Sequence, residues 1–168
     1  MKPSIPVFTA AMLAFAAGGC GSSPHETAIE PWEALLDDLR NAWEEEDLSL
    51  MGSLFREDFQ HHLLEVDWDD YDGDGIIDEY WGLEYELEFA GMIFASSDSI
   101  SFLISGDSAC PWSGDSTGVT MALNRLIDLK VFSAQGNTEE SMDALFLCRP
   151  DDEGDWYIWR WYDLESYL

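Results

Sequence analysis

The chain has 168 residues, of which 35 are Asp or Glu and only 7 are Lys or Arg, so its formal net charge is −28. Such an acidic surface repels phosphate backbones, and we therefore expect no nucleic acid partner. The 8 Trp, 9 Phe and 6 Tyr residues supply the material for a packed core, which argues against a disordered chain.

The N-terminus carries an apolar run from Ile5 to Ala17, which precedes Gly18-Gly19-Cys20. The run is too short for a permanent membrane span, so residues 1–19 are interpreted as a secretory signal peptide. Gly18-Gly19-Cys20 resembles the lipobox of bacterial lipoproteins, although Ala17 stands where that family usually has leucine. An ordinary signal peptide with an incidental cysteine is the alternative.

The lipoprotein resemblance implies export and lipidation of Cys20, which would attach the protein to a bacterial membrane. Gly21 follows instead of the Asp that favours inner-membrane retention in enteric bacteria, so the outer membrane is favoured. Residues 20–30 are polar and are predicted to form a lipidated tether. Residues 31–168 are predicted to form one domain.

The first part of this domain has helical patterns. Apolar residues at i, i+3, i+4, i+7 and i+11 predict an amphipathic helix that begins at Pro31. They are Trp32, Leu35, Leu36, Leu39 and Trp43. A short second helix follows and carries Leu48 to Phe55. Residues 59–66 are predicted as a strand. Residues 81–95 fit both the spacing of an amphipathic helix and the alternation of a strand, and the length of the segment favours a helix.

The second part has strand patterns. Ile100, Phe102 and Ile104 alternate with serines, and residues 119–131 predict a long strand whose apolar face is interrupted by Arg125. A turn at residues 135–137 leads to a strand that ends at Cys148, and residues 156–164 form the last strand. Helices followed by an antiparallel meander predict an α+β domain in which N-terminal helices pack on a curved antiparallel sheet.

Two cysteines remain once Cys20 is assigned to lipid. They are Cys110, in a loop-like stretch, and Cys148, at the end of an apolar run. An even number of cysteines in an exported protein predicts a disulfide between Cys110 and Cys148.

The order of these patterns resembles the nuclear transport factor 2-like, or SnoaL-like, superfamily. The resemblance rests on the leading helix, the stretch LSLMGSLFREDF, the helix beginning at Trp81, and the closing strand GDWYIWRWYDL with Trp161 and Asp163. It covers roughly residues 30–165. It implies a cone-shaped sheet closed by helices, with a pocket at the wide end.

The family contains isomerases, dehydratases, cyclases and members without catalysis, so the fold does not assign a reaction. Its enzymes use an Asp or His base with a hydrogen-bond donor inside the cone. The residues that this chain offers for such a pocket are His61, Tyr85 and Asp163; His62 and Tyr80 are further candidates. On a strand, at most one of His61 and His62 can enter the cone. The structural alternatives are a histidine satisfied by a neighbouring carboxylate and an Asp163–Arg160 ion pair.

No family catalytic motif is matched residue by residue, and we therefore expect a non-enzymatic ligand-binding or protein-interaction domain. The alternative is a small-molecule enzyme or sensor of the isomerase, dehydratase or cyclase type. An open cone with a buried titratable residue favours this alternative, whereas a cone plugged by Trp and Phe favours interaction.

The stretch DYDGDGIID, residues 70–78, resembles the opening of EF-hand loops and, more closely, the calcium loops of thrombospondin type 3 repeats. The resemblance implies that calcium is held by Asp70, Asp72, Asp74, the carbonyl of Ile76, and Asp78. An EF-hand has Glu at the twelfth position, where this chain has Trp81, so the expected affinity is weak. The alternative is an acidic turn that binds no ion.

Overall fold

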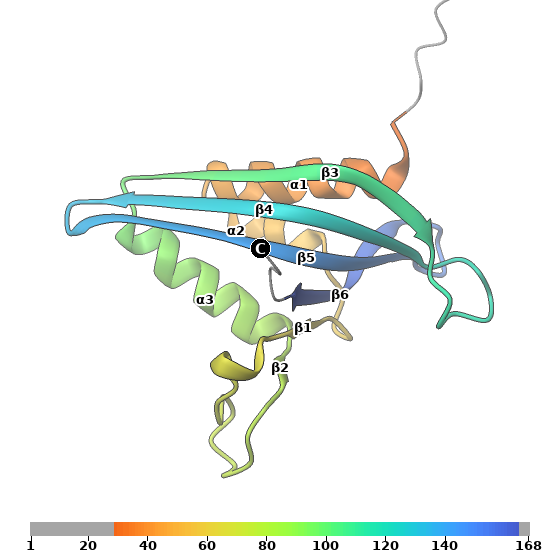
Figure 1. Ribbon diagram of the computed structural model, residues 1–168, viewed down its shortest axis with the longest axis horizontal. Helices are drawn as coiled ribbons and strands as arrows, with labels where there is room; N and C mark the ends of the chain where they lie inside the picture. Colours follow the sequence, from red (N-terminus) through yellow and green to blue (C-terminus); the bar gives the residue numbers. More distant parts are fainter. Residues whose placement is uncertain (1–28, 165–168) are drawn as a thin grey trace, which may run out of the picture.

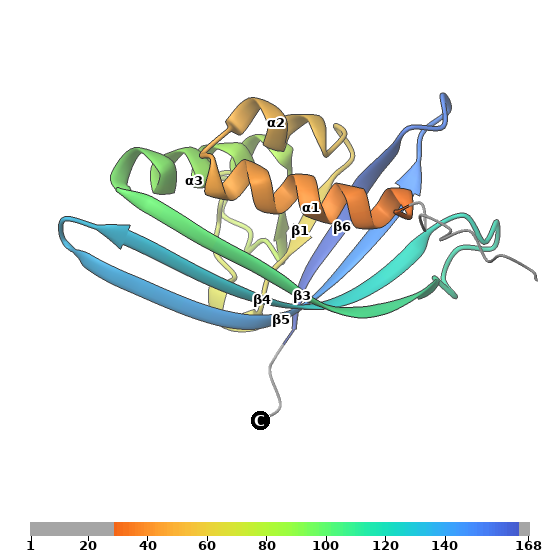
Figure 2. The same ribbon diagram turned by 90° about the horizontal axis from the view of Figure 1, so that it is seen from above.

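The computed structural model describes residues 29–164. The predicted signal peptide, Cys20 and most of the predicted tether lie outside the described residues. A strongly curved sheet forms one layer, and the helices cover its concave face (Figure 1, Figure 2). Within the described part, no helix combines the length and apolar character needed to cross a membrane.

The sheet has six strands in the order β2-β1-β6-β5-β4-β3. Its pairs are antiparallel except for β1 and β6, which run parallel. The strands are β1 (Gln60–His62), β2 (Tyr80–Trp81), β3 (Ser99–Pro111), β4 (Met121–Ser133), β5 (Gly136–Pro150) and β6 (Trp156–Leu164). The helices are α1 (Pro31–Glu44), α2 (Leu48–Ser53), α3 (Leu83–Ser96) and the 3-10 turn η1 (Glu65–Asp67).

Helix α1 begins at Pro31, whose missing N–H costs nothing in the first turn of a helix. Its apolar stripe is buried against the sheet, as the spacing predicts. Helix α2 is capped by Asp47, whose carboxylate accepts the backbone N–H groups of Ser49 and Leu50 at 2.9 Å. Together these two helices close one side of the cone.

Helix α3 covers the other side and differs from the prediction at its start. Trp81 belongs to β2, and the helix begins at Leu83. The buried residues of α3 are Glu86, Ala90 and Phe94, which recur every four residues on one face. The helix therefore buries a carboxylate on its inner face.

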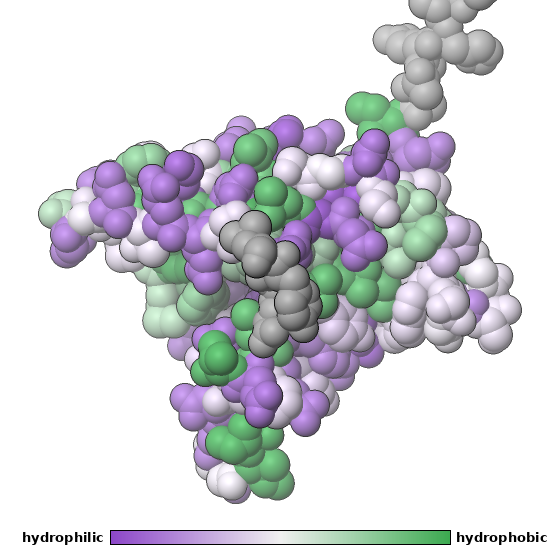
Figure 3. Space-filling model, viewed as in Figure 1, coloured by the Kyte–Doolittle hydropathy of each residue, from purple (hydrophilic) through white to green (hydrophobic). Residues whose placement is uncertain are grey.

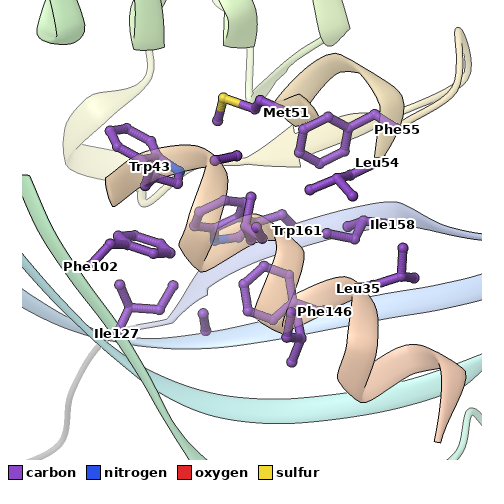
Figure 4. Close-up of a cluster of buried hydrophobic side chains, with 14 of the residues drawn as sticks. Leu35, Trp43, Met51, Leu54, Phe55, Phe102, Ile127, Phe146, Ile158 and Trp161 are labelled. Atoms are coloured by element: carbon purple, nitrogen blue, oxygen red, sulfur yellow. The ribbon is translucent and has the colours of Figure 1, made fainter. Parts of the chain in front are cut away.

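The core lies between α1, α2 and the concave face of the sheet (Figure 4). Phe146 of β5 is fully buried, and its ring centroid lies 4.8 Å from that of Trp161 on β6. Trp43 of α1 stacks on Phe102 at 5.2 Å and meets Phe94 edge-on at 5.4 Å. The removal of these large aromatic side chains from water is the main contribution that holds the helices on the sheet.

The α+β fold with a curved sheet is as predicted, with two differences. The strand predicted for residues 59–66 is shortened to β1, because the chain turns into η1 after His62. The sheet is also mixed, since β1 pairs parallel to β6 instead of extending an antiparallel meander.

The predicted disulfide is absent, since Cys110 and Cys148 are both free. Cys110 lies near the end of β3, opposite Ala122, and not in the loop predicted for it, and Cys148 on β5 lies opposite Met121. The two cysteines are separated by β4, so their Cα atoms lie about 10 Å apart, beyond the reach of about 7 Å for a disulfide. They also point to opposite faces, because Met121 and Ala122 are consecutive.

Candidate functional site

The wide end of the cone is open. A cavity of about 590 Å³ lies between α3, the β1–β2 pair and the concave face of the sheet. Most of its lining is apolar, and Trp43, Trp81, Phe102 and Trp161 contribute aromatic surface. This volume and lining are typical of small-molecule sites.

The cavity contains a buried charged cluster, which we call the His61 triad: His61, Glu86 and Asp163. His61 Nδ1 lies 2.8 Å from Glu86 Oε2, and His61 Nε2 lies 3.1 Å from Asp163 Oδ1. Trp81 Nε1 donates to the same Glu86 oxygen at 2.6 Å. Each member of the triad is at least 87 % buried in its side chain, since the exposed fractions are 9 %, 2 % and 13 %.

Sheet register fixes the position of His61. It lies opposite Trp161 in the parallel pair with β6 and opposite Trp81 in the antiparallel pair with β2. Its ring stacks on Trp161 at 4.5 Å between centroids and meets Trp81 edge-on at 5.1 Å. Asp163 lies two residues beyond Trp161 and therefore shares its face of the sheet. The triad is thus assembled by two neighbouring strands, β1 and β6, and the inner face of α3.

His61 is an imidazolium at neutral pH. Burial alone would lower the pKa of His61, but the charges of Glu86 and Asp163 and their hydrogen bonds raise it to about 9. In this state both ring N–H groups donate to carboxylates. The triad therefore places a cation between two carboxyl groups.

The raised pKa of His61 predicts a loss of stability in mild alkali. Between pH 6.5 and about 9 the folded protein holds a proton that the unfolded chain releases, so the free energy of unfolding falls as pH rises. The expected loss is on the order of 3 kcal/mol across this interval. Urea unfolding at several pH values measures it. Stability that is flat from pH 6.5 to 9 in wild type, or falls equally in a His61→Gln variant, would contradict this origin.

His62 lies on the opposite face of β1, as the strand geometry predicts. It stacks on Tyr162 at 4.3 Å and lies near Tyr80 at 5.2 Å. Burial, followed by the nearby charge of Arg160, lowers the pKa of His62 to about 4. Arg160 itself donates to the backbone carbonyls of Asp58 and Trp159 and not to Asp163. The alternative of an Asp163–Arg160 pair is therefore wrong, because Asp163 faces His61.

Four aromatic rings form one side of the cavity, and we call them the aromatic wall: Tyr71, Trp81, Tyr85 and Phe89. The centroid of Trp81 lies 5.2, 5.0 and 5.4 Å from those of Tyr71, Tyr85 and Phe89. The hydroxyl of Tyr71 donates to the carbonyl of Asp67. Tyr85 lines the cavity, and its hydroxyl has no hydrogen-bond partner among residues 29–164.

The structure thus brings His61, Tyr85 and Asp163 to one cavity. Sequence reasoning missed Glu86 and Trp81, which complete the hydrogen-bond arrangement around His61. One feature of the sequence indicates that Glu86 is buried. It lies four residues before Ala90 and eight before Phe94, so it belongs to the apolar stripe of the helix.

The acidic loop projects away from the sheet between β1 and β2 (Figure 1). Asp70, Asp72 and Asp78 each offer an oxygen, and these three oxygens lie within 4.8 Å of one another. Asp74 is outside this group, and its carboxylate accepts the N–H of Ile76 at 2.8 Å. Gly75 has φ of +88° and donates its N–H to Asp70 at 2.9 Å. An all-oxygen set of this kind fits Ca²⁺ better than softer metals.

The tip of this loop also carries exposed apolar side chains. Ile76 and Ile77 are 66 % and 57 % exposed, and hydrophobic atoms gather at the same tip in the space-filling view (Figure 3). The acidic cluster is thus next to an apolar tip, away from the core.

No protein-family model matches the chain, and no curated protein sequence matches it. Solved structures do match. A proposed aromatic ring hydroxylase from Novosphingobium aromaticivorans has a TM-score of 0.61 at 16% identity, over 82% of this chain and 88% of that one. An NTF2-like protein with a cystatin-like fold from the same organism has a TM-score of 0.58 at 9% identity, over 82% of each chain.

A proposed scytalone dehydratase from Novosphingobium aromaticivorans has a TM-score of 0.57 at 10% identity, over 79% of this chain and 80% of that one. At such identities the likeness concerns the fold. The chain has the nuclear transport factor 2-like α+β fold, with helices on a curved, cone-like sheet.

Proposed function

We propose that this protein binds a small organic molecule in the cone cavity, between the aromatic wall and the His61 triad. The observation that carries this proposal is an open cavity with a buried imidazolium between two carboxylates. Buried ion pairs usually stabilise a fold no better than apolar residues, so their presence in a cavity favours a functional role. The open cone also favours a small ligand over a purely protein-interaction role.

Proton transfer on the bound molecule is the second candidate function, of the isomerase or dehydratase type. Asp163 accepts from His61 through Oδ1, and its Oδ2 has no partner among residues 29–164. This oxygen could take a proton from a carbon next to a carbonyl, while the hydroxyl of Tyr85 donates to the carbonyl oxygen. The protonated Asp163 would then return the proton elsewhere on the product. The likeness to a proposed scytalone dehydratase supports this class.

A fragment screen by ligand-observed NMR tests the binding proposal. Hits should bind more weakly to Met142→Trp, because Met142 lines the cavity and an indole there would occupy part of the space that a ligand needs. Val119→Trp is the matched control, since Val119 is 43 % exposed and lies outside this cavity. If Met142→Trp does not fold, the same hits are compared in Leu129→Trp, since Leu129 also lines the cavity. Fragments that bind all variants equally, or no hits at all, would refute the proposal.

We also propose that the protein is held at a bacterial membrane by lipid on Cys20, which rests on the sequence Gly18-Gly19-Cys20. Expression in a bacterial host should place the wild type in the detergent phase, and Cys20→Ser should leave it in the aqueous phase. Intact-mass analysis that finds an unmodified Cys20 in the mature protein would overturn this proposal.

Calcium binding at Asp70, Asp72 and Asp78 is proposed as a structural support for the loop, on the observation that their oxygens gather. Calcium at about ten times its dissociation constant should then stabilise the fold by about 1–2 kcal/mol. Magnesium should do less, because it sheds water reluctantly and demands an octahedral site. Thermal unfolding at fixed ionic strength is the measurement.

Asp72→Asn should reduce the calcium response, whereas Asp152→Asn, an exposed turn residue with the same charge change, should leave it intact. Equal responses to calcium and magnesium in the wild type and both variants would mean that the loop is an acidic turn without a specific site.

A further inference from the structure

The charge of the cavity lining is negative. Four carboxylates line the cavity, and His61 is the only basic side chain among the described lining residues. They are Asp67, Glu86, Glu140 and Asp163. Both N–H groups of the His61 imidazolium already donate to Glu86 and Asp163, so His61 offers no donor to an anionic ligand. Carboxylic residues thus outnumber basic residues four to one in the described lining.

The basic residues of the described part lie elsewhere. Five of them form ion pairs with acidic side chains, and the sixth, Arg160, donates to backbone carbonyls of Asp58 and Trp159. The five are Arg40, Arg56, Arg125, Lys130 and Arg149. None of the six lines the cavity. A ligand carboxylate or phosphate would therefore enter a region of negative potential with no cation free to receive it.

The aromatic wall suits a cation. The faces of indole, phenol and phenyl rings attract a positive charge within about 6 Å of the centroid, and clustered rings recognise ammonium groups in this way. Glu86 accepts the indole N–H of Trp81 at 2.6 Å, so a carboxylate of the triad lies directly beside the aromatic wall.

We infer that the ligand of this cavity is an organic amine, whose ammonium group is held by Asp163 and the aromatic wall and whose apolar body fills the rest of the cavity. This inference specifies the proposed function and rests on it. The free Oδ2 of Asp163 accepts the ammonium N–H, and the formal charge of −28 draws cations towards the protein.

The test uses three probes of similar shape and different charge: tryptamine, tryptophol and indole-3-propionate. Isothermal titration calorimetry at pH 7 and fixed ionic strength should show tryptamine binding about tenfold more tightly than tryptophol, with no detectable binding of indole-3-propionate. Added salt should reduce the difference in affinity between tryptamine and tryptophol, because it screens the charge of the ammonium group. Equal or weaker binding of tryptamine, or no binding of any of the three, would overturn the inference. Neutral hits in the fragment screen would leave the binding proposal standing in that case.

Single substitutions test which residues bind the ammonium group. Asp163→Asn should weaken the binding of tryptamine about tenfold and leave the affinity for tryptophol unchanged. The control Asp152→Asn should change neither affinity. Tyr85→Leu should weaken the binding of tryptamine about 3- to 10-fold. Tyr85→Phe keeps the ring, so its affinity for tryptamine should stay within about twofold of the wild-type value. Equal losses for tryptamine and tryptophol in Asp163→Asn would show that Asp163 shapes the cavity without recognising charge.

Discussion

Replacing His61 with alanine should destabilise the protein by about 3–5 kcal/mol at pH 7, because it leaves Glu86 and Asp163 buried without their cation. The loss should shrink as pH rises towards 9, since the folded wild type then releases the proton that His61 holds. The stacking of His61 on Trp161 is lost as well, but this contribution does not depend on pH. Urea unfolding at pH 7 and pH 9 separates the two contributions.

The neighbouring residue provides the control for this experiment. His62→Ala makes the same change one position along β1, on the opposite face, where the half-buried ring is uncharged at neutral pH. It should cost about 1 kcal/mol or less at pH 7, and this cost should not change between pH 7 and pH 9, since the His62 pKa of about 4 lies below this interval. A small loss of stability in His61→Ala, or losses of stability of the same size in His61→Ala and His62→Ala, would contradict a charged triad.

Phe146→Ala should cost about 3–5 kcal/mol, because Phe146 is fully buried where β5 meets Trp161 and the core, and little can collapse into the space it leaves. The same measurement on Leu103→Ala is the control. Leu103 is 51 % exposed on β3, so its truncation should cost about 0.5 kcal/mol or less. Similar losses for the two variants would mean that the core is not centred between α1 and the sheet.

Much of the fold follows from local patterns. The spacing of Leu35, Leu39 and Trp43 predicted α1, and alternation predicted the long strands, because both patterns reflect one buried face over many residues. The pairing of β1 was not predictable in this way. Three residues carry too little periodicity, and the parallel partner β6 lies about a hundred residues along the chain.

The site was predicted only in part. His61 stood out as one of only three histidines, and Asp163 belongs to the closing strand, with Trp161, on which the family resemblance rests. Glu86 did not, since it is one of 35 acidic residues and only packing distinguishes a buried carboxylate from a solvated one. The prediction of a Cys110–Cys148 disulfide was wrong for a similar reason, because the number of cysteines does not reveal that β4 lies between them.

NMR of the protein with ¹⁵N,¹³C-labelled histidine tests the central claim, that a charged His61 lies in a ligand cavity. His61 is assigned by comparison with His61→Gln. The account predicts that both ring nitrogens of His61 stay protonated from pH 6 to pH 8, with a midpoint at about 9, and that a bound fragment shifts its signals saturably. A His61 ring that is neutral at pH 7 and is unmoved by every fragment that binds the protein would contradict the account.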